Sequence, residues 1–178
     1  LSEREESYVD RLTADIESIY RDHPRDVRIF WFLLFLRKEY IKYPTANLRA
    51  IAEWINAGYE TPILYIEAYY VFVQDPYLIS SLDSFTLKVL LWANKHNAIT
   101  KDMAVQMVHV LEVEKNFNPK AMELFKVCYT IYPELNLLMG IVTHLIKNGV
   151  SDSKYFGWYE KAIECNISVS GLYEAYLN

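Results

Sequence analysis

The sequence contains few of the residues that break regular secondary structure. Its 178 residues include five glycines and six prolines. All-β domains need many tight turns, and those turns draw heavily on Gly and Pro. The scarcity of both therefore argues against a β-sandwich or a β-barrel and favours long helices joined by short loops.

Cysteine is equally scarce. Cys128 and Cys165 form no Cys-x-x-Cys pair and are too few for a disulfide framework. Each falls inside a helical pattern, so we interpret both as small buried apolar residues. Such usage is compatible with a reducing compartment, and we expect a cytoplasmic protein.

The sequence has neither a basic stripe nor a membrane-length apolar run. The net charge is −5 and the pI is about 5.4, with Lys and Arg scattered among acidic neighbours. Phosphate contacts dominate nucleic-acid affinity, so we expect no nucleic-acid partner. The most apolar run, "IFWFLLFL" at 29–36, is far shorter than the ~20 residues of a membrane span.

Motifs that carry chemistry are missing as well. The chain contains no phosphate-binding glycine loop, no Gly-x-Ser-x-Gly and no His-Glu-x-x-His. His109 and Glu112 lie one helical turn apart, but a metal site needs at least three ligands, so we interpret them as part of a solvated face. We predict no catalytic residue, no metal ligand and no cofactor, and we favour a protein that is not an enzyme.

What the sequence does contain is a regular series of helical patterns. Apolar residues recur at helical spacing between Pro, Gly and capping residues. We predict Thr100 and Asn118 as N-caps, Ser151 or Ser153 as the cap of the ninth helix, and Gly58 and Asn148-Gly149 as helix ends. About ten helices follow, over 2–21, 26–43, 45–57, 62–73, 84–97, from Thr100, 119–132, 133–148, 154–165 and from about 170.

One short motif occurs twice. "YIKYP" at 40–44 and "YTIYP" at 129–133 are each followed by Asn-Leu at the same offset, and "YRDHP" at 20–24 is a weaker third copy. Proline cannot continue a helix, so each copy is interpreted as a helix end and a turn into the next helix. The tyrosines three residues apart share one face and would pack that helix end. A repeated helix–turn–helix unit of about 35 residues is the prediction.

The segment "AMELFKVCYTIYP" has a pattern that is typical of a known repeat family. Ala121, Phe125, Cys128 and Pro133 have the spacing of the second helix of a tetratricopeptide repeat, and "YFGWYEKAIECN" is similar through Tyr159 and Ala162. The chain thus resembles the tetratricopeptide-like superfamily with degenerate repeats, and HEAT-like repeats of ~40–47 residues are the alternative.

The resemblance implies a single helical-repeat domain over 1–178, arranged as an all-α superhelix, or solenoid, of antiparallel helices in stacked pairs. We expect it to be a segment of a longer protein whose end helices, such as "GLYEAYL", expose apolar side chains and allow self-association. The expected function is that of a scaffold for a protein or peptide partner. Candidate partner-binding residues are the polar side chains Gln106, His109, Thr143, His144 and Lys147.

A second hypothesis is a fragment of an α/α-toroid enzyme that acts on glycans or another extended substrate. The fifteen tyrosines and four tryptophans could stack on sugars or fill the spaces between helices. Because Tyr40, Tyr43, Tyr129 and Tyr132 recur with the repeat, packing is favoured. An enzyme of this kind would need a deep pocket with two carboxylates, whereas a scaffold would have a shallow groove.

Overall fold

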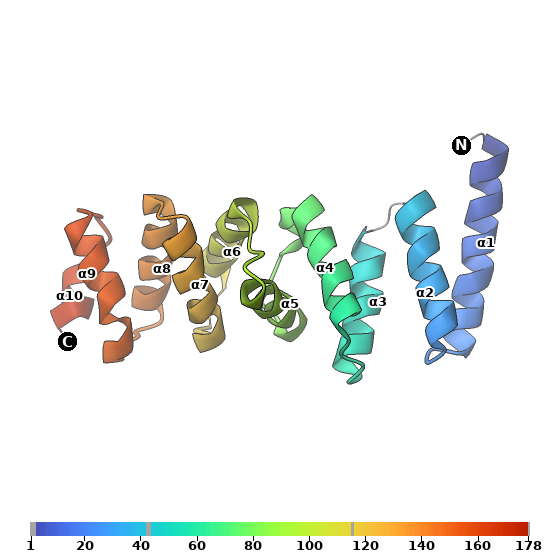
Figure 1. Ribbon diagram of the computed structural model, residues 1–178. Coiled ribbons are helices and arrows are strands. Elements are labelled where there is room, and N and C mark those ends of the chain that lie inside the picture. Colours follow the sequence, from blue (N-terminus) through green and yellow to red (C-terminus); the bar gives the residue numbers. More distant parts are fainter. Residues whose placement is uncertain (1–2, 42–43, 115, 178) are drawn as a thin grey trace. The chain divides into compact units, whose positions relative to one another are not determined.

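The computed structural model describes residues 3–41, 44–114 and 116–177, and within these ranges all regular secondary structure is helical (Figure 1). The expected all-α class is thereby confirmed. The helices are α1 (Glu3–Asp22), α2 (Val27–Leu36), α3 (Pro44–Asn56), α4 (Pro62–Gln74), α5 (Ser84–Lys95), α6 (Lys101–Val113), α7 (Pro119–Ile131), α8 (Leu135–Lys147), α9 (Phe156–Glu164) and α10 (Leu172–Leu177).

Most of the residues predicted as N-caps stand at the start of a helix in the structure. The Thr100 hydroxyl accepts a hydrogen bond from the Met103 amide at 3.2 Å, and the Asn118 side chain accepts one from the Lys120 amide at 3.0 Å. The predicted cap of the ninth helix is wrong. A 3₁₀ turn, Ser153–Tyr155, precedes α9. The Asp152 carboxylate accepts a hydrogen bond from the Lys154 amide in this turn, because an Asp side chain readily accepts from the backbone N–H two residues further on.

The second predicted helix, over 26–43, is shorter as an α-helix than expected. It ends at Leu36 and continues as a π-helical turn, Arg37–Ile41. The Arg37 guanidinium donates to the Glu17 carboxylate at 2.9 Å and to the Ala46 carbonyl at 3.4 Å, so the turn ties α1 to the start of α3. Residues 42 and 43 of the predicted helix lie outside the described residues.

Four helices end in the same hydrogen-bonded motif. After α3, the Gly58 amide bonds the Ile55 carbonyl and the Tyr59 amide bonds the Trp54 carbonyl, both at 3.0 Å, which is a Schellman arrangement. The residue after the cap has positive φ in each case: Gly58, Asn97, Gly149 and Asn166. The predicted glycine ends at 58 and 149 are confirmed, and asparagine fills the same place after α5 and α9.

The repeated Tyr-Pro motif marks helix junctions, as predicted. Pro44 is the first residue of α3, and Pro133 lies between the end of α7 and the start of α8. The two following leucines, Leu48 and Leu137, are both buried. The two asparagines differ, because Asn47 is buried whereas Asn136 is exposed. In the first copy, residue 43 and the Tyr40 side chain lie outside the described part of the chain.

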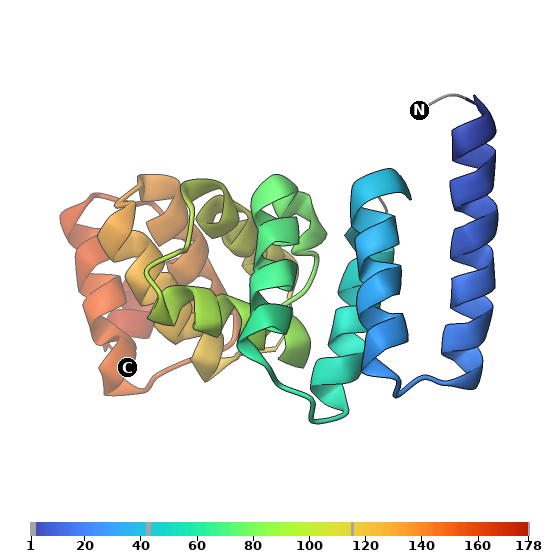
Figure 2. The same ribbon diagram turned by 45° about the vertical axis from the view of Figure 1, so that its right-hand side comes forward.

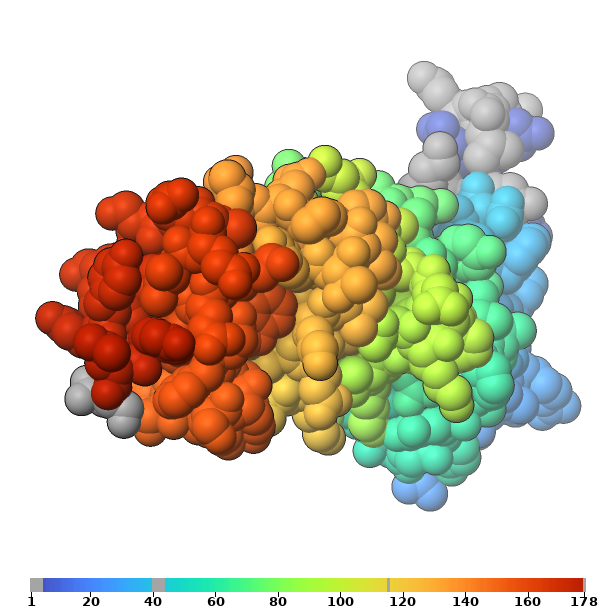
Figure 3. Space-filling model, turned by 60° about the vertical axis from the view of Figure 1, so that its left-hand side comes forward, coloured from blue at the N-terminus to red at the C-terminus, as the bar shows by residue number. Residues whose placement is uncertain are grey.

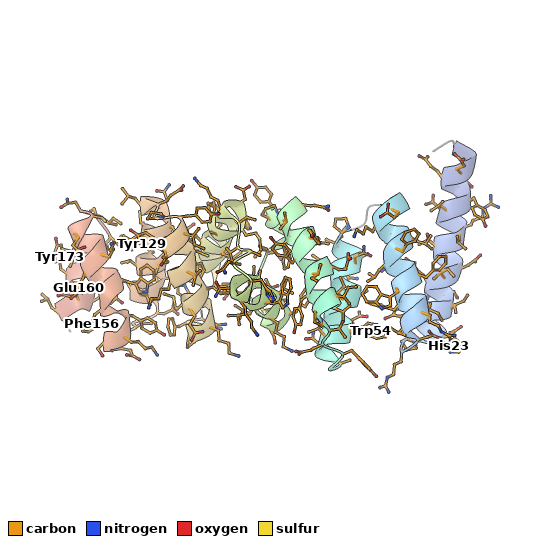
Figure 4. All side chains as sticks on the ribbon, viewed as in Figure 1. His23, Trp54, Tyr129, Phe156, Glu160 and Tyr173 are labelled. Atoms are coloured by element: carbon orange, nitrogen blue, oxygen red, sulfur yellow. The ribbon has the colours of Figure 1, made fainter. Side chains whose placement is uncertain are left out.

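The chain divides into two compact units, Leu1–Leu64 and Tyr65–Asn178, which are described separately. In the first unit α1 packs on α2, and Trp54 of α3 joins both (Figure 4). The Trp54 ring stacks on Phe30 with centroids 4.5 Å apart, and its Nε1 donates to the Tyr20 hydroxyl at 2.6 Å. Burial raises the pKa of Tyr20. These aromatic side chains hold helices together, as the packing interpretation predicted.

In the second unit, two pairs of helices pack with one helix between them in the sequence. α6 packs on α8 and α5 on α7, while α7 also contacts α6 and α8 (Figure 2). Lys101 pairs with Glu134, and the Leu111 carbonyl lies 3.1 Å from His144 Nδ1. Both pairs join residues 33 positions apart, so α6 and α8 run in the same direction with a 33-residue step.

The second unit closes with α9 and α10. The Tyr176 hydroxyl of α10 donates to the Glu160 carboxylate at 3.1 Å, and the Phe156 and Tyr176 rings meet edge to face. Figure 4 labels Phe156 and Glu160 on α9. Helix α10 forms part of the surface at this end of the unit, shown in dark red in Figure 3. Tyr173 and Leu177 are 65% and 80% exposed there. The expected exposure of apolar side chains on the last helix is confirmed.

Candidate functional site

The second unit contains a groove between α6 and the junction of α7 with α8. Its volume is about 340 Å³, the lower end of the range for ligand pockets. Helix α6 contributes Lys101, Ala104, Val105, Val108, His109 and Glu112. The opposite side is formed by Tyr132, Glu134, Asn136, Leu137 and Met139.

A glycine brings the two long helices of the groove together. A Cβ atom on Gly140 of α8 would lie 2.4 Å from Cγ1 of Val108, which is too close for two carbons that are not bonded to each other. Glycine is therefore required at this crossing unless Val108 moves. The close approach places buried Val108 and Leu137 at the floor of the groove.

The floor also contains apolar side chains that solvent reaches. Val105 is 42% exposed and Met139 is 41% exposed, and they come from α6 and α8 respectively. Exposed apolar side chains next to buried ones make a surface on which a partner's apolar side chain gains free energy by leaving water. The floor can therefore hold an apolar group.

Charged residues stand at the two ends of the groove. At the start of the helices, Lys101 forms an ion pair with Glu134, which raises the pKa of Lys101. Glu134 occupies the N-cap position of α8 but makes no side-chain cap hydrogen bond. Near the end of α6, a Glu112 carboxylate oxygen lies 3.7 Å from His109 Nδ1, and the two side chains are 47% and 64% exposed respectively.

The structure does not bring the five predicted partner-binding residues together. His109 lines the groove, whereas Gln106 donates its side-chain N–H to the Ile79 carbonyl at 3.0 Å. On α8, Thr143 is half-buried and Lys147 is exposed. Gln106, Thr143, His144 and Lys147 do not line the groove.

His144 belongs to the core and not to a surface. Its residue exposure is 2%, and Nδ1 lies 3.1 Å from the Leu111 carbonyl near the end of α6. The last carbonyls of a helix lack partners within it, and the imidazole satisfies this one. Burial lowers the pKa of His144. Its Nε2 is buried without a hydrogen-bond partner in the described parts of the chain.

Sequence reasoning missed most of the groove. Tyr132, Asn136 and Leu137, which line it, belong to the second copy of the Tyr-Pro motif that was interpreted as a turn signal. The recurrence was the available signal, but it did not show that α6 would lie opposite. Lys101 and Glu134 are 33 residues apart, and no local pattern links them.

Two further observations describe the chemistry of the surface. Among the residues that the structure describes, no three His, Cys, Asp or Glu side chains gather where a metal ion could be held. In the same part of the chain, no helix combines the length and the hydropathy that crossing a membrane requires.

The fold and the groove define an all-helical protein with an open, partly apolar surface site. Its sequence matches the model of the family of unknown function DUF5717, N-terminal, over residues 1–178. The chain belongs to this family. Comparison with curated proteins finds no match, and comparison with solved structures finds none either.

Proposed function

We propose that the chain is an interaction scaffold of stacked helical pairs, a tetratricopeptide-like solenoid, and that its α6–α8 groove binds a peptide segment of another protein. The carrying observation is the same-direction packing of α6 on α8 with a 33-residue step. Stacked helix–turn–helix repeats produce this relation, because equivalent helices of successive units lie side by side.

The step length favours one repeat family over the other. Tetratricopeptide units have about 34 residues and HEAT units about 40–47. A step of 33 residues between α6 and α8 is close to the first value. The packing of α5 on α7 gives a second layer, as two-helix repeats require.

The chemistry of the groove supports a peptide as its occupant. Val105 and Met139 offer an accessible apolar floor, and Asn136 at the rim has an amide that can both donate and accept hydrogen bonds. Peptide sites commonly combine pockets for apolar side chains with polar groups for the main chain. The two carboxylates of the groove each lie beside a basic side chain, Glu134 beside Lys101 and Glu112 beside His109.

The two cysteines support a cellular location for this scaffold, and the last helix supports a way in which it associates. Both cysteines are free, which supports the cytoplasmic location that we propose. The exposed Tyr173 and Leu177 of α10 support self-association, or contact with a further helical pair, at this end of the second unit.

Selection from a phage-displayed library of random 12-residue peptides tests the proposed function. Selected peptides should lose at least about tenfold in affinity for Val105→Glu and Met139→Glu variants, because a buried charge replaces an apolar contact. Val113→Glu is the matched control, since Val113 is 80% exposed on the same helix and outside the groove. Circular dichroism would verify that all three variants fold.

Peptides that bind all variants equally, or a selection that yields no peptide, would refute the groove as a peptide site. A glycan array run in parallel examines the alternative hypothesis. Binding of an oligosaccharide that Val105→Glu abolishes would favour a carbohydrate site in place of a peptide site.

A further inference from the structure

We infer that the peptide bound in the α6–α8 groove carries an apolar side chain and, about three residues away, a Lys or Arg that pairs with Glu112. This inference rests on the proposed function and specifies its partner. It follows from three properties of the groove: its charge, the direction of its helices, and the distance between its apolar floor and Glu112.

The charge of the groove is unbalanced. Its lining contains one lysine and two glutamates, and the lysine is engaged with Glu134. The remaining carboxylate, Glu112, has no lysine or arginine beside it in the groove lining, and its nearest ring nitrogen there is His109 Nδ1 at 3.7 Å. The side chain of Glu112 is 47% exposed, so a cation on a partner can reach it.

The direction of the helices adds to the negative charge at the end of the groove where Glu112 lies. Each helix carries partial negative charge at its C-terminal end, which favours a cation there. Because α6 and α8 run in the same direction, their dipoles add instead of cancelling. Glu112 lies in the last turn of α6, so its charge and the helix dipole attract the same kind of group.

The distance between the apolar floor and Glu112 sets the spacing in the peptide. Val105 and Glu112 are seven residues apart on α6, which is two turns on one face and about 10.5 Å along the axis. An extended peptide advances about 3.3–3.6 Å per residue, so three residues cover this distance. The expected partner motif is therefore an apolar residue, two variable residues, and Lys or Arg, in either chain direction.

The experiment is the same random 12-residue phage library, selected in parallel on three proteins. On the natural sequence, we expect selected peptides to be enriched in Lys or Arg about three positions from a large apolar residue. On Glu112→Lys, the enrichment should change to Asp or Glu at that position. Glu123→Lys is the matched control, because Glu123 is exposed on α7 outside the groove and the charge change is identical.

Affinity measurements on one selected peptide complete the test. Fluorescence anisotropy of a labelled synthetic copy should show a loss of about 2- to 5-fold for Glu112→Gln, the range for an exposed ion pair. Replacing the basic residue of the peptide by Glu should weaken binding to the natural sequence and strengthen binding to Glu112→Lys. Raising the salt concentration should reduce the difference.

The outcomes separate this inference from the proposed function. Selected peptides that depend on Val105 but show no basic enrichment, or an acidic one, would overturn the inference and leave the peptide groove intact. Basic enrichment that persists on Glu112→Lys would also overturn it. Peptides that are insensitive to Val105→Glu would instead refute the groove as the site.

Discussion

At the scale of single residues, the two cysteine thiols have different surroundings. Cys128 is fully buried in α7, as predicted, and burial raises its pKa to about 12. Cys165 at the end of α9 is partly exposed, so the interpretation of both cysteines as buried is wrong for this residue. Because the thiolate is the reactive form, a native chain at pH 8 should react with a thiol reagent at Cys165 and not at Cys128. Mass spectrometry of the labelled peptides measures this.

The control for the thiol prediction is the Cys165→Ser variant. It should show no rapidly labelled thiol when folded and one thiol after unfolding in guanidinium chloride. Equal labelling rates of the two cysteines in the native chain would contradict the burial of Cys128.

His144 makes the stability of the fold depend on pH. Burial lowers its pKa below the ordinary value of about 6.5, and Glu114 and Lys147 are the charged groups that act on it. Below about pH 6.5 the unfolded chain takes up a proton at this residue that the folded chain does not, so the free energy of unfolding falls as the pH is lowered. Above about pH 6.5, His144 no longer reduces the free energy of unfolding.

Urea unfolding of His144→Gln between pH 5 and 8 measures this dependence. The variant should lose that part of the pH slope, which is at most about 1.4 kcal/mol per pH unit for one proton. His23→Gln is the control, because His23 is exposed after the end of α1. An unchanged slope in His144→Gln would show that the residue does not titrate as inferred.

At the scale of helices, the ends of α3 and α8 depend on glycine. Gly58 and Gly149 have φ values of +91° and +59°, and apart from the glycine and its two chain neighbours no described residue has an atom within 4 Å of the place that an added Cβ would take. Replacement by Ala therefore tests backbone conformation alone, and we expect each change to cost about 1–2 kcal/mol of unfolding free energy. Thermal or urea unfolding monitored by circular dichroism gives the values.

Gly157 provides the matched control for these helix ends. It lies inside α9 without a positive φ and also has free space around it. Gly157→Ala should stabilise the chain by about 0.5–1 kcal/mol, because Ala has the better helix propensity. A loss of stability in Gly157→Ala that equals the loss in Gly58→Ala would argue against the left-handed conformation as the cause.

The crossing of α6 and α8 gives a second prediction at this scale. Gly140→Ala should destabilise the chain by about 1–3 kcal/mol despite the gain in helix propensity, because the new methyl group overlaps Val108. The same change in a Val108→Ala background should cost less or stabilise. A double-mutant cycle measures the coupling, and additive effects would mean that the two positions are not in contact.

At the scale of the whole molecule, the described helices differ in how much of their surface they bury. Thr13 is the buried residue among the described side chains of α1, whereas α8 contains Leu138, Ile141, Val142 and Leu145 at 0% exposure. Regions with few buried apolar contacts open at low free-energy cost. Native hydrogen exchange followed by mass spectrometry or NMR should therefore show roughly 100-fold lower protection in the first half of α1 than in α8. Similar protection in α1 and α8 would contradict this expectation, because it would mean that α1 opens as rarely as α8 despite burying fewer side chains.

Residues close together in the sequence determined most of the helices. Thr100, Asn118 and Gly58 each act within a few residues of their own helix end, so their patterns predicted the ends correctly. The same local rules predicted that Pro44 and Pro133 mark helix junctions. They did not predict the π-helical turn after α2, which accompanies contacts from Arg37 to Glu17 and to the Ala46 carbonyl.

The sequence by itself determined the all-helical class, most of the helix ends and the burial of Cys128, because these depend on local hydrogen bonding and on hydrophobic spacing. The tertiary structure decided the groove and the burial of His144. Both depend on α6 lying beside α8, which brings together residues about 33 positions apart such as Leu111 and His144. Contacts over that separation form only when whole helices pack, so no local pattern in the sequence specifies them.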